Sequence, residues 1–343
     1  MVNVNGLPIA GFSSKKPFHS IQLPDETFIS PLDSIQPTRT SIDKLSLVFD
    51  CDDVTEQNKF QISNLVFGAL KEFKLQGYNL FRPPAYDARG DGGYNRTMRL
   101  ESVHPKRYVA DLSFSPMAKL AAFYRLECNP AHLSQVDREA LHDLLHFLSY
   151  SNGAVYETTL DSLRVSRLDF AADYADLRLS QIALHRPKVR HFQSHISDKG
   201  IERGYHLDGQ YMGSPQSDRQ VRAYEFDGLT RIELIRRFNE GSELLSAVDT
   251  AFIDSIRVHK MSDLPEILPN FHPRYTTAVT SAIERFGLVG FLKTLDLSKA
   301  ELKTVQRKLA KSPNLWDATA MNAACKQDFT TAIDRLQLHP TIH

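Results

Sequence analysis

Four short stretches of this chain place an arginine two residues before a carboxylate or a tyrosine. They are Arg125-Leu-Glu127, Arg167-Leu-Asp169, Arg222-Ala-Tyr224 and Arg231-Ile-Glu233. Residues i and i+2 of a strand point to the same side, so each stretch would bury its middle residue and present two polar side chains together. If the strands share a sheet, one face gathers carboxylates, a phenol and guanidiniums. Carboxylates hold divalent cations, arginine binds phosphate and tyrosine acts as a nucleophile, which indicates phosphodiester chemistry on DNA.

Each of these stretches also has a purely structural interpretation. In the strand from Val165 to Asp173, Leu168 and Phe170 form an apolar face, while Arg167 and Asp169 form a polar one. Such a face is typical of a solvated edge strand with a cross-strand ion pair. Repetition of the pattern on several strands favours the functional interpretation without removing the structural one.

The composition limits the class of protein. The 343 residues are 42% hydrophobic and 24% charged, which is typical of a globular chain that buries a core. No apolar run approaches the roughly 20 residues that span a bilayer, and the N-terminus lacks a secretory pattern. Three widely spaced cysteines predict reduced thiols in a cytoplasmic protein. A net charge of zero argues against indiscriminate nucleic-acid binding but leaves room for local basic surfaces.

Three regions are expected along the chain. Residues 1–40, rich in Ser, Pro and Thr, predict a flexible N-terminal arm. Residues 41–262 predict a catalytic domain, and prolines near its end mark a boundary. Residues 263–343 predict a helical C-terminal region that is a candidate for DNA binding. The overall expectation is an α+β fold with a mostly antiparallel sheet backed by helices and a helical C-terminal segment.

Hydrophobic periodicity locates the elements. Strands are expected at 42–49, 95–102, 107–114, 122–128, 163–174, 188–195, 205–212, 220–226 and 229–238. Helices are expected at 56–75, 134–150, 179–184, 243–257, 275–295, 299–311, 315–325 and 328–337. Asp227-Gly228 lies between two alternating runs and predicts a tight hairpin, which would place Tyr224 and Glu233 on neighbouring strands.

The order of these motifs resembles a known family. The run Tyr211-Met-Gly-Ser-Pro-Gln-Ser-Asp-Arg-Gln-Val-Arg-Ala-Tyr224 resembles the Y-x-G-S-x-x-S-x-x-x-x-R-x-Y segment of rolling-circle replication initiators, namely the plasmid Rep_trans type and the RstA-like proteins of filamentous phages. The stretches Arg231-Ile-Glu233, Arg167-Leu-Asp169 and Leu126-Glu-Cys-Asn-Pro130 fit other motifs of that family in the same order. This chain departs from the family in having Glu225-Phe226, where a basic residue often follows the tyrosine.

The resemblance implies a Rep-like catalytic domain that nicks and rejoins one strand of a phage or plasmid origin. Tyr224 would become linked to a 5′-phosphate, with Arg222 beside it. A phenol needs activation at neutral pH, and Mg²⁺ or Mn²⁺ would offset charge on the phosphate. The first candidate ligands are Asp169 and Glu233, with Glu127 and Asp173 next. Tyr205 and Tyr211 compete with Tyr224 as nucleophile.

Several further residues are candidates for contact with DNA. They are Arg167, Arg231, Ser214, Ser217, Lys188, Arg190, Lys303, Arg307 and Lys308. The two serines are either turn formers or phosphate donors, and the last three residues lie on a helix whose basic face equally suits solvent. His191 and His195 are interpreted as surface histidines.

The expected partners are origin DNA, as a single strand or an extruded hairpin, a host helicase and polymerase, and a second copy of the chain in a homodimer. No membrane partner is expected. Two other functions stay open. One is a non-catalytic DNA-binding regulator on the same scaffold. The other is a metal-dependent nuclease without a covalent intermediate.

Overall fold

The computed structural model describes residues 36–50, 54–83, 93–117, 122–151, 160–186, 189, 191–195, 208–214, 217–243, 248, 250–269 and 271–338. The predicted N-terminal arm falls outside this range except for residues 36–40, of which the last two already belong to the first strand. From Asp33 onward the chain forms one compact unit by its internal contacts.

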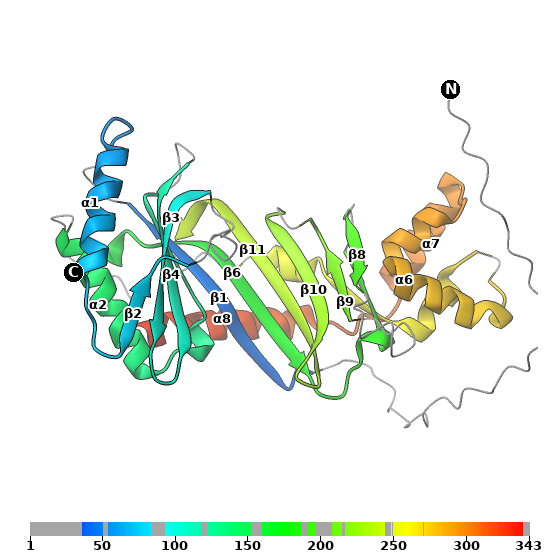
Figure 1. Ribbon diagram of the computed structural model, residues 1–343. Helices are drawn as coiled ribbons and strands as arrows, with labels where there is room; N and C mark the ends of the chain where they lie inside the picture. The colour runs from blue at the N-terminus through cyan, green and yellow to red at the C-terminus, as the bar shows by residue number, and fades with distance from the viewer. Residues whose placement is uncertain are drawn as a thin grey trace, which may run out of the picture. The chain divides into compact units, whose positions relative to one another are not determined.

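The fold is α+β, and its main element is a ten-stranded sheet in which every described pairing is antiparallel (Figure 1). The strand order is β2-β3-β4-β5-β1-β6-β11-β10-β9-β8. The strands are β1 (Arg39–Phe49), β2 (Tyr78–Phe81), β3 (Tyr94–Ser102), β4 (Arg107–Pro116), β5 (Tyr124–Cys128), β6 (Arg164–Tyr174), β8 (Phe192–His195), β9 (Gly209–Met212), β10 (Arg219–Phe226) and β11 (Leu229–Glu243).

Strand β1 lies at the centre of the sheet, between β5 and β6. The first strand of the described chain therefore joins the β2–β5 meander to the β6–β11 half, which a prediction from local sequence cannot anticipate. The Asp227-Gly228 hairpin is confirmed, since both residues have positive φ, of 50° and 77°, as a two-residue primed turn requires.

Helices back the apolar side of the sheet. Helices α1 (Lys59–Glu72) and α2 (Gln135–Ser151) contact β4, as expected. The long C-terminal helix α8 (Ala318–Leu336) packs on β1, and its Met321 Sδ lies 4.0 Å from the Tyr174 hydroxyl of β6. Nε2 of His142 in α2 lies 2.6 Å from the carbonyl of Leu336, so α2 and α8 cover the same side.

The other C-terminal helices have a small core of their own. Helices α6 (Thr276–Thr294) and α7 (Lys299–Lys311) pack with the 3₁₀ helix η4 (Met261–Ile267) around Leu264, Ile283, Leu288 and Val305. Strands β7 (Ile182–His185) and β12 (Arg257–Lys260) form a two-stranded sheet beside them. The predicted helical C-terminal region is thus divided between this core and the main sheet.

Four predicted helices differ from the structure. Residues 179–184 form a 3₁₀ turn, η2 (Leu179–Gln181), followed by β7, because a short buried apolar run suits a strand as well as a helix. In place of the helix predicted at 243–257, β11 extends to Glu243, α5 covers only Thr250–Asp254, and β12 begins at Arg257 to pair with β7. The two helices predicted after residue 315 are one, α8.

Short 3₁₀ segments complete the described elements, namely η1 (Pro130–His132) and η5 (Pro273–Tyr275). None of the described helices combines the length and apolar character that a membrane crossing requires.

Candidate functional site

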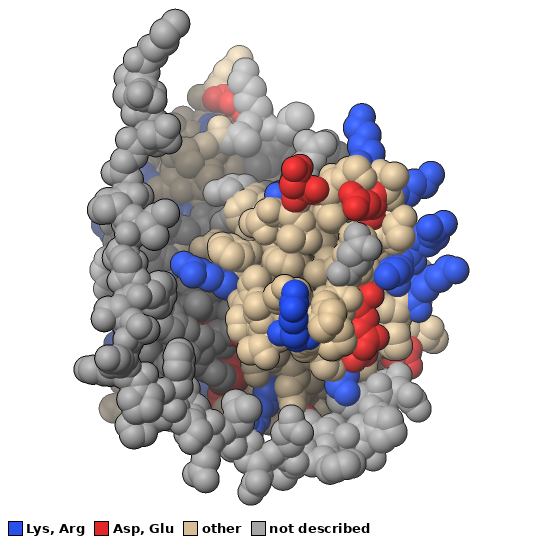
Figure 2. Space-filling model, turned by 90° about the vertical axis from the view of Figure 1, so that its right-hand side faces the viewer, with Lys and Arg blue, Asp and Glu red and all other residues tan. Residues whose placement is uncertain are grey.

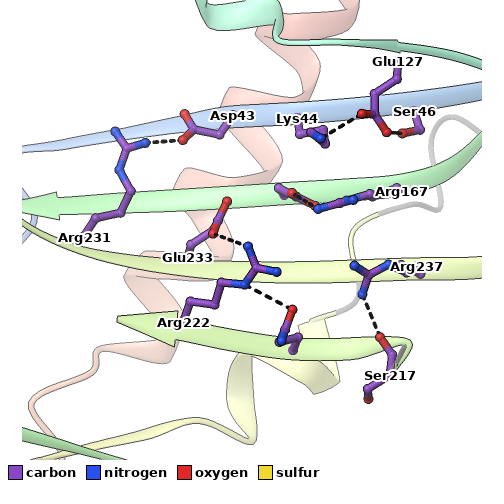
Figure 3. Close-up of polar contacts among 12 residues, drawn as sticks. Asp43, Lys44, Ser46, Glu127, Arg167, Ser217, Arg222, Arg231, Glu233 and Arg237 are labelled. Carbon is purple, nitrogen blue, oxygen red and sulfur yellow. Dashed lines mark hydrogen bonds and ion pairs between the residues drawn. The ribbon is translucent and has the colours of Figure 1, made fainter. Parts of the chain in front are cut away.

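The four Arg-x-acid and Arg-x-Tyr stretches do meet on one side of the sheet, opposite α8 (Figure 3). Across β10 and β11, Tyr224 faces Arg231 and Arg222 faces Glu233. Across β11 and β6, Arg231 faces Asp173. We call this side the polar face. It is defined by Lys44, Ser46, Arg125, Glu127, Arg167, Asp169, Asp173, Tyr211, Arg222, Tyr224, Arg231 and Glu233, together with Asp43.

Asp43 and Lys44 join the polar face through an irregularity in β1. The pairing of β1 with β6 runs from Ile42–Phe170 directly to Lys44–Asp169 and skips Asp43. A β-bulge of this kind re-aims side chains, so two consecutive residues point to the same side. Sequence reasoning missed both residues, since strict alternation would have turned one of them away.

Two of the strand-internal ion pairs form as the sequence predicts. Arg167 donates to both oxygens of Asp169, at 2.8 and 2.7 Å. Arg125 donates to Glu127 at 2.6 Å. Glu127 also accepts hydrogen bonds from Lys44 and Ser46, at 2.7 and 2.9 Å. Burial would raise the pKa of Glu127, but Lys44 and Arg125 outweigh it and lower the pKa to about 2.

The third expected pair, Arg231 with Glu233, does not form within β11. Arg231 donates to both oxygens of Asp173 on β6, at 2.6 and 2.9 Å, and it also bonds Asp43. Asp173 accepts two further bonds from Arg39, at 3.0 and 2.7 Å. Although burial opposes ionisation, these guanidiniums hold the pKa of Asp173 below its usual range.

Glu233 is left with a weaker contact. Its carboxylate lies 3.8 Å from Arg222, and the residue is only 7% exposed. Burial raises the pKa of Glu233 to about 7, and the negative charge of Asp169 adds to this effect. Asp169 itself is buried, and burial raises its pKa against the opposing effect of Arg167. A buried carboxyl with a pKa near neutrality is a feature that functional sites often show.

Tyr224 is half-buried, and its phenol is not activated. Burial raises the pKa of Tyr224 to about 12 with help from Glu233, while Arg231 acts in the opposite direction through charge and a hydrogen bond. Two other side chains of the polar face are partly exposed, since that of Arg222 on the same strand is 31% exposed and that of Lys44 on β1 is 37% exposed.

Tyr211 lies next to Tyr224 on the polar face. Its strand neighbour Gly209 pairs with Tyr224, and a Cβ at Gly209 would lie 2.9 to 3.1 Å from the Tyr211 ring and hydroxyl. The ring therefore occupies space that any other residue at 209 would fill. The Arg222 guanidinium carbon lies 6.0 Å from the centre of the same ring. Tyr205, the other competing tyrosine, lies outside the described residues.

The polar face offers two carboxylates that suit a divalent cation. In the described part of the chain, no group of three or more His, Cys, Asp or Glu side chains could hold a metal ion. Asp169 and Glu233 nevertheless repel one another, and Mg²⁺ is often held by one or two carboxylates plus substrate phosphates. Glu233 fits that donor set, whereas Asp169 would share its oxygens with Arg167, as Glu127 and Asp173 would share theirs with their own cationic partners.

The remaining predicted DNA contacts divide into three groups. Ser217 is a turn former: its amide donates to the Ser214 carbonyl at 2.9 Å, and its carbonyl accepts from Arg237. Lys188 and Arg190 lie outside the described residues. Lys303, Arg307 and Lys308 are exposed on α7, where Lys308 also donates to the carbonyl of Glu266 at 3.2 Å.

The surface interpretation of the two histidines is tested at one position only. His191 is exposed, and the side chain of His195 lies outside the described part of the chain.

Comparison with known proteins adds little to this geometry. No family model and no curated protein matches the sequence. One similar solved structure is a rolling circle replication initiator protein from Geobacillus stearothermophilus. It is 17% identical, with a TM-score of 0.30, over 59% of this chain and 75% of that one. A TM-score this low carries no argument about family or function, which rest on the residues themselves.

Proposed function

We propose that this protein initiates rolling-circle replication of a phage or plasmid by nicking and rejoining one strand of its origin. The observation that carries the proposal is the position of Tyr224, Arg222, Asp169 and Glu233 on one side of three neighbouring strands. A phenol, a partly exposed guanidinium and a carboxylate pair are the groups that a tyrosine-dependent phosphoryl transfer needs.

In this reaction the Tyr224 oxygen attacks the scissile phosphorus and forms a phosphotyrosyl bond to the 5′ end. The bond from phosphorus to the 3′ oxygen breaks, and that oxygen takes a proton from water as a free 3′-hydroxyl. Because Tyr224 is half-buried, its own proton passes to solvent. Arg222 would hold the non-bridging phosphate oxygens, and Arg231 favours the phenolate that attacks.

Asp169 and Glu233 would hold a Mg²⁺ or Mn²⁺ ion, with other ligands from phosphate and water. When bound, such an ion offsets the charge that develops on the phosphate oxygens. Arg167 orients Asp169 through its two hydrogen bonds. The exposed basic residues Lys303 and Arg307 of α7 would contact origin DNA. A host helicase would unwind the duplex, a host polymerase would extend the 3′-hydroxyl, and a homodimer would bring two such sites together.

A regulator that binds DNA without cutting it is the second candidate. One observation favours it: Glu127, Asp169 and Asp173 are already neutralised by cationic side chains, as structural ion pairs would be. The third option, a nuclease without a covalent intermediate, would leave Tyr224 as a packing residue.

The test incubates supercoiled DNA carrying the protein's own replicon with Mg²⁺ or Mn²⁺ and the full-length chain. Denaturing gels then detect the nick and any protein–DNA adduct. We expect the wild type and Tyr211→Phe to form a metal-dependent adduct and Tyr224→Phe to form none. Cleavage that persists in Tyr224→Phe without an adduct would indicate the nuclease, and specific binding without cleavage by the wild type would indicate the regulator.

A further inference from the structure

The first part of α6 carries an exposed face that its own core does not use. The exposed residues from Arg274 to Phe286 are Arg274, Tyr275, Thr277, Ala278, Ser281, Arg285 and Phe286, counting the turn that leads into the helix. At about 100° per residue they fall within about half of the helix circumference. All of them precede Gly287, where the helical geometry breaks. We call this set the α6 face.

Two aromatic rings stand on the α6 face, each beside an arginine. Tyr275 is 48% exposed and Phe286 is 45% exposed. The guanidinium carbon of Arg274 lies 4.6 Å from the centre of the Tyr275 ring, and that of Arg285 lies 5.5 Å from the centre of the Phe286 ring. The rings are 11 positions apart, roughly 16 Å along the axis. The exposed residues between them are Thr277, Ala278, Ser281 and Arg285, and the first three of these have small side chains.

The charge around the α6 face favours a polyanion. Residues 271–312 contain eight Lys and Arg against three Asp and Glu, although the whole chain has a net charge of zero. Figure 2 views the end of the molecule that carries α6 and α7, and Lys and Arg side chains project from it, most of them along one side. Exposed aromatic rings next to arginines are typical of surfaces that combine base stacking with phosphate contacts, and this local excess of positive charge favours nucleic acid over an apolar protein partner.

We propose that the α6 face binds single-stranded DNA, with unpaired bases stacked on Tyr275 and Phe286 and with Arg274 and Arg285 against the phosphates. In a duplex the bases stack on one another and expose only their edges, so exposed rings can stack only on unpaired bases. The inference rests on the proposed function for the source of that strand, because nicking an origin releases one. The inference places the released DNA strand on a surface that lies outside the polar face.

The test measures binding of the full-length protein to a fluorescent oligothymidylate by anisotropy in EDTA, where metal-dependent nicking cannot occur. Tyr275→Ala and Phe286→Ala are each expected to weaken binding about fivefold or more, and Tyr275→Phe is expected to bind as the wild type does. Phe60→Ala is the matched control, since Phe60 is an aromatic residue of α1 that is 75% exposed, and it should leave binding unchanged.

A salt titration separates stacking from phosphate binding. The double variant Arg274→Gln/Arg285→Gln should have a shallower slope of log affinity against log salt concentration. The slope should decrease by about 0.7 for each phosphate that the protein no longer neutralises. The ring substitutions should leave the slope as it is. Because binding in EDTA does not require nicking, a failure of the nicking hypothesis would leave this result standing.

Four results would overturn the proposal. The first is a wild-type protein that does not bind the oligonucleotide, and the second is ring substitutions that do not change its binding. The third is ring substitutions that weaken binding to double-stranded DNA as much as binding to the oligonucleotide. The fourth is ring variants that no longer form a homodimer that the wild type forms. The third would assign the surface to double-stranded DNA, and the last would assign it to contact between copies of this chain.

Discussion

Arg231 bonds Asp173 on the neighbouring strand and not Glu233, two residues along its own strand. The choice follows from register, because Arg231 and Asp173 are directly opposed across β11 and β6. A guanidinium gains more from two parallel hydrogen bonds than from one diagonal contact. Glu233 therefore keeps only the 3.8 Å contact with Arg222, and its carboxylate faces the charge of Asp169.

This arrangement predicts that Glu233→Gln stabilises the protein at high pH. The pKa of Glu233 is about 7 in the folded state, against 4.5 for the free side chain. Between these values the folded state holds a proton that the unfolded state has released, so wild-type stability falls as the pH rises from 4.5 to 7. Glutamine does not titrate, and we expect a gain of about 1–3 kcal/mol at pH 8 and almost none at about pH 4.5.

Urea unfolding at the two pH values measures this difference, with the exposed Glu225→Gln of β10 as control. Adding Mg²⁺ at about pH 8 should raise the unfolding midpoint of the wild type and not that of Glu233→Gln. A variant less stable than the wild type at that pH would mean that the pairing with Arg222 outweighs burial.

The ion pair of Arg231 with Asp173 predicts a large cost for its removal. Asp173→Asn leaves two guanidiniums facing an uncharged amide, and the Arg231 and Asp173 side chains are only 8% and 1% exposed. We expect a loss of about 3–5 kcal/mol in unfolding free energy. Asp50→Asn is the matched control on the exposed pair with Arg164, where at most about 1 kcal/mol is expected.

The pH dependence gives this prediction a second readout. Because the folded pKa of Asp173 is lowered, its stabilisation is present above the unfolded value near 3.8 and is lost as the pH falls through the folded value. The difference between the wild type and Asp173→Asn should therefore narrow below about pH 4. A constant difference would assign the loss to packing.

The position of Tyr211 predicts the effect of a methyl group at residue 209. The Cβ of Gly209→Ala would lie 2.9 Å from the Tyr211 ring, whose far end can move aside, so we expect less than about 1 kcal/mol of destabilisation. The displaced ring would disturb Arg222 and Tyr224, and the nicking rate should fall by about 10- to 100-fold. The double variant Gly209→Ala/Tyr211→Ala should recover most of it. Unchanged nicking by Gly209→Ala would separate Tyr211 from the reaction.

Much of the polar face could be predicted from the sequence, because alternation in a strand is a local property. The residues of Arg167-Leu-Asp169 and Arg231-Ile-Glu233 point as their spacing requires, and the Asp227-Gly228 turn fixes the register of β10 against β11. The pairing of Arg231 could not be predicted, since it depends on β6 lying beside β11. The bulge at Asp43 is likewise set by strands that are distant in sequence.

Contacts between segments that are distant in sequence also determine the geometry of the C-terminal helices. The apolar pattern at 275–295 predicts one continuous helix, and α6 has nearly these bounds but a break at Gly287, with φ of 66°. The cause lies almost a hundred residues earlier, where Phe192 of β8 packs against this glycine. Local periodicity contains no information about that contact.

The contact of Phe192 with Gly287 predicts that an alanine at residue 287 destabilises the protein, whereas an alanine at Gly68 stabilises it. A Cβ at Gly287 would lie 1.7 to 2.2 Å from atoms of the Phe192 ring, and the positive φ disfavours any side chain. We expect Gly287→Ala to cost at least about 2 kcal/mol and to increase hydrogen exchange in β8 and α6. Gly68→Ala is the matched control: a Cβ at this position of α1 meets nothing within 4 Å, and the change should stabilise by about 0.5–1 kcal/mol.

Adding Phe192→Ala to Gly287→Ala separates the two causes of the destabilisation. The double variant removes the overlap and keeps the backbone strain, so a residual cost of about 1–2 kcal/mol should remain relative to Phe192→Ala alone. If the double variant is no more stable than Gly287→Ala, the overlap is not what breaks α6, and the positive φ at Gly287 alone accounts for the destabilisation.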